Sequence, residues 1–457
     1  MFVYFIILLV NIYMYVTAPL TMDKGFMGNS IILSFITLFT FYVEQKRGKW
    51  NLSKIYLRHS VFFIMAYMIV FYQCDIDYVL GLNEGLDTYL WYDGRYAAKA
   101  LALSNLGLLG FCIGYRYRQG YEPKNFKNIK NVEVRQVWKK RLLYISAFFI
   151  YLYLILVPKD FKYGVESEGG IATSIMSYII SIFIVILVLY SRDFRNQNRS
   201  DWFSYFKKPL ILMIVYIGLI VVTGRRTEAI RVASLLMFCY FYCLGNKVNY
   251  KKVFIYGILF LTLFSVVGVL RSLQSGNVAE SLKIIQEYQS VSPFTRELAG
   301  SVNTVHIAMS HYPQQYGYTY GGTFFPGFLK IIPGLSGVYN YLFVPPGVDI
   351  NSDMIITKLY FGNDISFGLG SSVVADNYIA FGPLGMVIIM FLFGLFVRYL
   401  ETGTFCNANV SLYFLAFSFS CYSQLLYACR QSLSLLLLNI SYAWLILYII
   451  TPKIKRQ

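Results

Sequence analysis

Two adjacent arginines, Arg225 and Arg226, stand in the short polar segment 223–228 between two apolar runs, 209–222 and 229–244. A helix that starts here would carry two cations at its positive end, which the helix dipole disfavours. A bound anion would compensate them, because guanidinium groups match phosphate oxygens and the N–H groups at a helix start add further donors. The segment therefore predicts a phosphate or diphosphate site. The alternative is that these arginines reach lipid headgroups or pair with nearby acids.

Further arginines accompany this pair. Arg231 falls about one turn inside the following apolar run, where an ionisable side chain is costly and usually functional. Arg430 occupies a second short turn, 427–431, between two apolar runs, and Arg271 and Arg296 lie in a long polar segment. We expect these side chains to contribute to the same anionic substrate site.

Candidate acids and bases are fewer. His306 and His311 lie in the same long polar segment, and Glu297 directly follows Arg296. Asp376 precedes an apolar run, where a carboxylate could orient a hydroxyl group of a substrate. Each has a structural alternative: a packed histidine, a salt bridge for Glu297, and a charge at a helix start for Asp376.

The pair Asp75 and Asp77 has the spacing with which some sugar transferases hold a divalent metal. We place both in an acidic outer loop with Glu84, Asp87 and Asp93 and expect no metal and no cofactor. No Walker loop, dinucleotide fingerprint, HExxH motif or GxSxG elbow occurs in the sequence. Their absence weakens functions that need ATP hydrolysis, redox cofactors or a serine nucleophile.

The elements that position these residues are membrane-spanning helices. Of 457 residues, 57% are hydrophobic and 14% are charged, and many apolar runs approach the roughly 20 residues that cross a bilayer. The sequence predicts an all-α polytopic integral membrane protein that forms a single domain over 1–457. We expect about twelve spans, near residues 2–18, 28–43, 55–73, 98–115, 141–158, 171–190, 209–223, 228–244, 252–269, 378–398, 409–427 and 432–450.

The basic residues indicate the orientation of these spans. Most of the 40 Lys and Arg residues lie in alternate connections and in the C-terminal tail, whereas acidic residues crowd the connection that follows the third span. The positive-inside rule then places both termini in the cytoplasm. The net charge of +17 is therefore a topology signal rather than a sign of nucleic-acid binding. The seven cysteines lie mostly in or beside spans and predict no disulfide framework.

One long outer loop, 270–375, is inserted between the ninth and tenth spans. It is rich in Gly, Pro and Tyr, and loops of this length are uncommon unless they are functional. From Arg296 onwards its periodicity predicts an amphipathic helix, with one apolar stripe and a small polar stripe opposite. We expect this helix to lie on the membrane surface or to pack over the bundle, as an active-site element or as an ordinary connector.

The sequence resembles the bacterial O-antigen polymerases, the Wzy class of oligosaccharide repeat-unit polymerases. The Gly-Arg-Arg turn 224–226, the large outer loop and the glycine-rich stretch 368–385 carry the resemblance. Members tend to have an acidic residue in such a stretch, and Asp376 is the matching position. The resemblance implies an architecture like that of GT-C membrane glycosyltransferases in the bacterial inner membrane, with the active site facing the periplasm.

The resemblance also implies the reaction. Members transfer a glycan from undecaprenyl diphosphate to the non-reducing end of another lipid-linked repeat unit, without a metal. By this resemblance the arginines would bind the diphosphate, and His306, His311, Glu297 or Asp376 would face the acceptor. The rings of Tyr318 and Tyr320 would stack on sugars. A chain-length-regulating copolymerase is the implied protein partner.

Two other functions stay open at this point. An O-antigen ligase, or another lipid-diphosphate-sugar transferase, would need similar outer arginines and a loop histidine, although no clear ligase-like histidine motif is present. A flippase or transporter for lipid-linked oligosaccharides would carry charges at mid-membrane and internal repeats. The sequence shows no repeat and gathers its candidate residues on one side, which favours a polymerase.

Overall fold

The computed structural model describes residues 2–46, 58–82, 93–117, 134, 136–156, 170–197, 201–222, 226–245, 299–332, 334–345, 348–362, 365, 368–406 and 410–451. All regular structure in these ranges is helical, as expected for an all-α protein. The long outer loop before residue 299 and the expected span near 252–269 lie outside the described residues.

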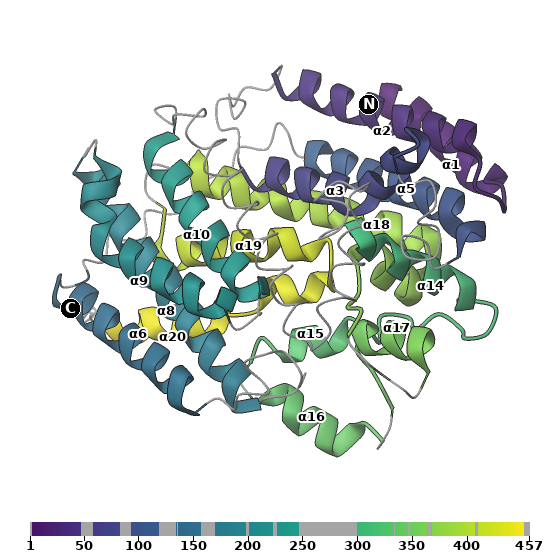
Figure 1. Ribbon diagram of the computed structural model, residues 1–457. Coiled ribbons are helices and arrows are strands. Elements are labelled where there is room, and N and C mark those ends of the chain that lie inside the picture. Colours follow the sequence, from purple (N-terminus) through teal and green to yellow (C-terminus); the bar gives the residue numbers. More distant parts are fainter. Residues whose placement is uncertain are drawn as a thin grey trace, which may run out of the picture.

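The other expected spans all fall on helical segments, and eight of these segments are long and apolar enough to cross a membrane. The helices of the bundle are α1 (Phe2–Thr17), α2 (Lys24–Lys46), α3 (His59–Val79), α5 (Gly94–Tyr117), α6 (Gln136–Leu156), α8 (Gly170–Asn196), α9 (Trp202–Val222), α10 (Arg226–Leu244), α18 (Val373–Phe405), α19 (Leu412–Ala428) and α20 (Ile440–Ile450). Figure 1 shows α18 and α19 in the middle of the bundle.

The contact between α5 and α18 depends on glycine. A Cβ atom at Gly114 would overlap the backbone carbonyl of Phe391, and a Cβ at Gly394 would overlap the carbonyl of Phe111. Small residues let two helix backbones approach closely where the surrounding lipid supplies no hydrophobic driving force for association. Most of α5 is consequently buried inside the protein.

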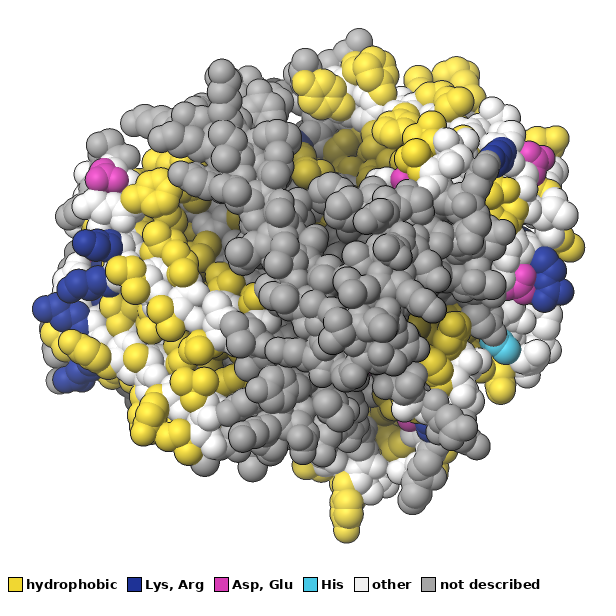
Figure 2. Space-filling model, in the orientation of Figure 1, with side chains coloured by type: hydrophobic (Ala, Val, Ile, Leu, Met, Phe, Trp, Pro, Cys, Tyr) yellow, Lys and Arg dark blue, Asp and Glu magenta, His cyan; other side chains and the backbone are white. Residues whose placement is uncertain are grey.

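The bundle has two ends, which we name after the acids near the two ends of α18. At the Asp376 end, Val373 at the start of α18 donates a backbone hydrogen bond to Cys429 (3.3 Å). At the Glu401 end, Thr404 donates to Ser418 on α19 (2.8 Å). Figure 2 shows hydrophobic side chains over much of the described surface of one face, with Lys and Arg gathered at its left edge.

The described part of the long loop, 299–372, folds into short helices at the Asp376 end. They are η4 (Ala299–Val302), α14 (Asn303–His311), α15 (Phe325–Leu329), α16 (Leu335–Phe343) and α17 (Ser352–Phe361). In Figure 1 they lie at the lower right of the bundle. Helix α14 is the expected amphipathic helix, but it is not a surface helix: residues on all its sides, including Thr304, His306 and Ile307, are buried. It contacts α5, α17 and α18.

One further expectation is corrected. Asp75 and Asp77 belong to α3 and are buried, so they do not lie in an acidic outer loop. Because residues two apart on a helix point to different sides, the two carboxylates lack the geometry of a shared metal site. The last expected span is confirmed as a segment long and apolar enough to cross a membrane, 433–450. Its helix is interrupted: the 3₁₀ helix η5 (Leu433–Leu437) precedes α20, and Asn439 between them is left-handed (φ 72°).

Candidate functional site

The two short arginine-bearing turns of the sequence meet around Tyr427. The guanidinium carbon of Arg231 on α10 lies 5.8 Å from the centroid of the Tyr427 ring at the end of α19. Arg231 also pairs with Glu228 one turn earlier, with 3.6 Å between the charged atoms. Arg430 and Thr227 lie close enough to Tyr427 to act on its hydroxyl group. The N-terminus of α10 and the turn after α19 therefore form one polar surface, although 196 residues separate Arg231 from Tyr427.

Arg226 is the first residue of α10, so its backbone stands at this surface. Its side chain is not described, and Arg225, Arg271, Arg296 and Glu297 lie outside the described residues. The roles expected for these five stay predictions.

Arg430 connects this surface to the long loop and to α18. Its Nε donates a hydrogen bond to the Ser301 hydroxyl in η4 (2.8 Å). From the adjoining α14, Thr304 donates to Ser372 (2.8 Å), the residue that caps the N-terminus of α18 and accepts from the Ala375 backbone N–H (3.2 Å). One chain of contacts thus links the arginine turn to the start of α18.

Asp376 lies in the first turn of α18 and has no exposed surface. The hydroxyl groups of Thr323, Ser352 and Ser432 interact with its carboxylate from three other segments, yet none meets the geometry of a hydrogen bond. The amide of the adjacent Asn377 is also buried without a hydrogen bond to the described part of the chain.

Buried polar groups in proteins are nearly always hydrogen-bonded, so an exception requires an explanation. Around Asp376 the exceptions are concentrated, since the hydroxyl groups of Thr323 and Ser371 also make no hydrogen bond with any described residue. Their oxygen and nitrogen atoms are buried and keep hydrogen-bonding capacity that a polar ligand such as a sugar could use. Asp376 was a candidate from the sequence alone, whereas Asn377, Thr323 and Ser432 were not, because their types and spacing are unremarkable.

The two candidate histidines have different surroundings. His306 on α14 is fully buried, and burial lowers its pKa to about 4, against the opposing effect of the Asp93 carboxylate. At neutral pH its ring is therefore uncharged. His311 at the end of α14 is partly exposed and shares a hydrogen bond with the Gln315 side chain through Nδ1 (2.6 Å).

The two candidate tyrosines also differ. Tyr320 is 83% exposed, as a sugar-stacking ring would be. Tyr318 packs against the kink of α18: a Cβ atom at Gly382 would lie 2.8 Å from its ring. A backbone hydrogen bond from Thr319 to Ile379 (3.0 Å) holds this segment on α18. Tyr318 thus has a packing role that sequence reasoning did not foresee.

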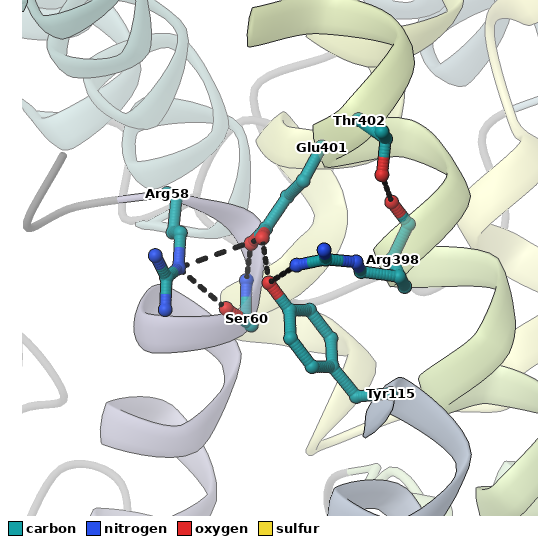
Figure 3. A network of polar contacts seen from close by, with 6 residues as sticks. All are labelled: Arg58, Ser60, Tyr115, Arg398, Glu401 and Thr402. Atoms are coloured by element: carbon teal, nitrogen blue, oxygen red, sulfur yellow. Dashed lines mark hydrogen bonds and ion pairs between the residues drawn. The ribbon is translucent and has the colours of Figure 1, made fainter. Parts of the chain in front are cut away.

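A second polar cluster lies at the Glu401 end and was missed by sequence reasoning. The Glu401 carboxylate accepts hydrogen bonds from the Ser60 backbone N–H (2.6 Å) and the Tyr115 hydroxyl and pairs with Arg58 at 3.5 Å. Arg398 donates to the same hydroxyl (3.2 Å). Figure 3 shows the two arginines approaching from opposite sides. The spacing of Arg398 and Glu401, one turn apart at the end of an apolar run, was the available signal.

These two clusters are separate sites. Asp376 and Glu401 are 25 residues apart on α18, which corresponds to roughly 37 Å along a straight helix. The Glu401 cluster joins α3, α5 and α18 and is nearly inaccessible, with both charged partners of the Arg58–Glu401 pair almost fully buried. It is therefore suited to holding the helices together, whereas the Asp376 end gathers buried polar groups beside the arginine-bearing segments.

Comparison with known families identifies the family of this chain. The family model described as O-antigen polysaccharide polymerase Wzy matches residues 1–456. None of the curated proteins and none of the solved structures compared with the chain matches it. Because the match extends over essentially the whole sequence, the resemblance drawn from its motifs is confirmed, and the chain belongs to the O-antigen polysaccharide polymerase Wzy family.

Proposed function

We propose that this protein polymerises undecaprenyl-diphosphate-linked O-antigen repeat units at the periplasmic face of the inner membrane, by a glycosyl transfer that uses no metal. Family membership supports repeat-unit polymerisation. The observation that carries the site is the meeting of the Arg231 and Arg430 segments around Tyr427, beside the buried polar cluster at Asp376. The bias of basic residues toward the other connections supports the periplasmic side.

In this proposal the arginines bind the leaving group. The bond between the anomeric carbon of the donor sugar and the diphosphate oxygen breaks, and negative charge develops on the departing lipid diphosphate. Cations that are already in place stabilise such charge more effectively than water does. We assign this role to Arg225, Arg226 and Arg430, with Arg231 behind them. Arg271 and Arg296 would reach the same diphosphate from the long loop.

The acceptor hydroxyl forms the new glycosidic bond to that carbon and must lose its proton. We assign Asp376 as the group that accepts the proton or orients the hydroxyl. Its carboxylate lies among hydroxyl groups and beside the Asn377 amide, which are the partners that a sugar would use. His311 and Tyr320 are exposed enough to contact the sugar, as Glu297 would from the loop, whereas His306 is buried and would act through its neighbours.

The test is the surface polysaccharide of a strain that lacks the gene. Complementation with the unaltered gene should restore a ladder of repeat lengths, whereas Arg226→Ala should leave core plus a single repeat unit at equal protein abundance. Arg226→Lys keeps the charge but loses the two-pronged geometry, and we expect partial activity. Lys330→Ala is the control, because Lys330 is an exposed residue directly after α15, and it should leave a normal ladder.

Other outcomes would decide against the proposal. Lipid-linked polymer that is never attached to core in the deletion strain would identify a ligase, and repeat units trapped on the cytoplasmic leaflet would identify a flippase. Normal ladders from both Arg226→Ala and Arg225→Ala would show that the arginines only anchor the helix. Loss of polymerisation in EDTA-treated membranes, restored by a divalent cation, would contradict the metal-free reaction. Cross-linking of the membrane complex would test the expected copolymerase partner.

A further inference from the structure

Two of the candidate membrane-crossing segments are interrupted. Helix α18 breaks at Gly382 (φ 72°, ψ −170°), which precedes Pro383. The last segment, Leu433–Ile450, begins as 3₁₀ helix and turns at Asn439 before α20. Non-helical backbone at membrane depth is tolerated only where protein covers it or where it lines a cavity. Both interruptions lie in segments that are otherwise long and apolar enough to span a membrane.

An apolar groove lies between these interruptions. The residues that line it come from α15, from α18 on both sides of the kink and from η5, and the groove has a volume of about 460 Å³. Phe393, Leu433 and Leu436 are buried and line its base, whereas Phe328 and Leu392 are about half exposed at its rim. Ser434 is the single polar side chain among the described residues that line it. The groove is therefore open along one side and almost entirely hydrocarbon.

The groove adjoins the polar cluster at Asp376. Ser434 shares a hydrogen bond with Ser432 (2.8 Å), and the Ser432 hydroxyl interacts with the Asp376 carboxylate. Phe381, which also lines the groove, follows Asp376 by five residues, or about 7.5 Å along the helix. A ligand that occupied both would have a polar head at Asp376 and an apolar chain that runs along α18 toward the Glu401 end.

We propose that this groove binds the polyprenyl chain of the lipid-linked substrate and so sets the position of its diphosphate against the arginines, with the sugars toward Asp376. The inference rests on the proposed function and adds the site of the lipid. A methyl-branched isoprenoid chain suits a wide groove walled by phenylalanine rings, and the adjoining polar cluster calls for a head richer in hydroxyl groups than a phospholipid has. The volume accommodates only the head-proximal part of a long chain, and the remainder would stay in the bilayer.

Photo-cross-linking tests the occupant. A photoreactive p-benzoylphenylalanine replaces Leu392 in the full-length protein, in membranes that contain undecaprenyl-diphosphate-linked repeat units, and adduct masses are read by mass spectrometry. The matched control is Ile214 on α9, which has similar exposure (54% against 50%) on another membrane-facing helix. We expect polyprenyl adducts at 392 in at least tenfold excess over 214. Equal yields at both positions, or phospholipid adducts alone at 392, would overturn the proposal.

Kinetics with two donors separate this inference from the proposed function. Leu392→Trp fills the groove, and we expect it to raise KM for the undecaprenyl donor about tenfold, the loss expected when roughly two methylene groups are no longer buried. For a donor with a two-isoprene chain the KM should not change, and Ile214→Trp should behave as the unaltered protein with both donors. If Leu392→Trp and Ile214→Trp behave alike, the groove does not bind the lipid chain, and the proposed function is unaffected. If the unaltered protein polymerises neither donor, the proposed function is wrong as well.

Discussion

At the scale of single residues, the informative feature is a carboxylate and an amide that are buried next to each other without hydrogen bonds. Leaving such groups unsatisfied costs free energy, on the order of 1–3 kcal/mol for each neutral group and more for a charge. Asp376 and Asn377 incur that cost at the start of α18, at the end of the bundle where the arginine turns meet. A substrate that supplies the missing hydrogen-bond partners would recover this free energy when it binds.

Asp376→Asn is expected to reduce polymerisation by about a hundredfold or more, because a positioned base contributes about 10² to 10⁴ in rate. The amide keeps the shape of the side chain, so protein abundance should not change. Asp353→Asn removes an exposed acid of the neighbouring α17 and serves as the control. Ladder density per molecule of protein measures both, and an active Asp376→Asn variant would exclude a base at this position.

His306 is expected to make stability depend on pH. Because burial lowers its pKa to about 4 in the folded protein, the unfolded chain, with a pKa near 6.5, binds the proton more readily. The free energy of unfolding is therefore unaffected by His306 above about pH 6.5 and decreases as pH falls toward 4. At pH 5 the decrease is about 2 kcal/mol. The difference in unfolding temperature between pH 7.5 and pH 5 should shrink in His306→Asn and not in His311→Asn.

At the scale of elements, the pairing of α5 with α18 determines where the site lies. Both helices reach from the Asp376 end to the Glu401 end, and glycines let their backbones touch. The kink at Gly382 then turns the first part of α18 toward the long loop, with Tyr318 packed in the bend. A helix without the close approach or without the bend would place Asp376 elsewhere.

Gly114→Ala tests this contact. The added methyl group would collide with backbone atoms of Phe391, which cannot rotate away, so we expect a loss of about 1–3 kcal/mol in stability. Gly218→Ala on α9 meets nothing within 4 Å and is the matched control. Removal of a helical glycine there should leave stability unchanged or raise it by up to about 1 kcal/mol. Thermal unfolding in detergent compares the two variants, and similar losses for both would argue against the close approach.

At the scale of the whole molecule, the two ends of the bundle have different tasks. The Glu401 end is closed by a buried ion pair and hydrogen bonds that join three helices, whereas the Asp376 end gathers buried carboxylate, amide and hydroxyl groups beside the arginine-bearing segments. A buried ion pair adds little net stability, because desolvation offsets the attraction, but removal of one partner leaves an uncompensated charge. The Glu401 cluster is thus best understood as fixing how the helices fit together.

Glu401→Ala is expected to destabilise the protein by about 3–5 kcal/mol, because Arg58 loses its carboxylate partner in a buried setting. Asp349→Ala removes an ion pair with Lys358, whose side chain is exposed, and it should cost at most about 1 kcal/mol. Unfolding in detergent measures both. The combined change Arg58→Met and Glu401→Leu should recover much of the loss, and equal effects of Glu401→Ala and Asp349→Ala would contradict a structural role for the cluster.

The sequence by itself determined the class of protein, the positions of most helices and the family. Length and apolarity of a span are local properties that the thickness of the bilayer fixes, so they can be read without knowing which helices touch. The Gly-Arg-Arg turn at 224–226 and the stretch around Asp376 are local in the same sense, and the family match agrees with them. Arg225, Arg271, Arg296 and Glu297 lie outside the described residues and stay predictions.

Only the tertiary structure decided which of these segments meet. Arg231 and Tyr427, or Arg58 and Glu401, are contacts between residues far apart in the chain, and packing of whole helices sets them. Packing also explains two differences from expectation. Asp75 and Asp77 lie in α3 rather than in a loop, and α14 is buried, because neighbouring helices cover both segments. Spacing along the chain carries no information on such neighbours, since it specifies a helix face but not the helix that will cover it.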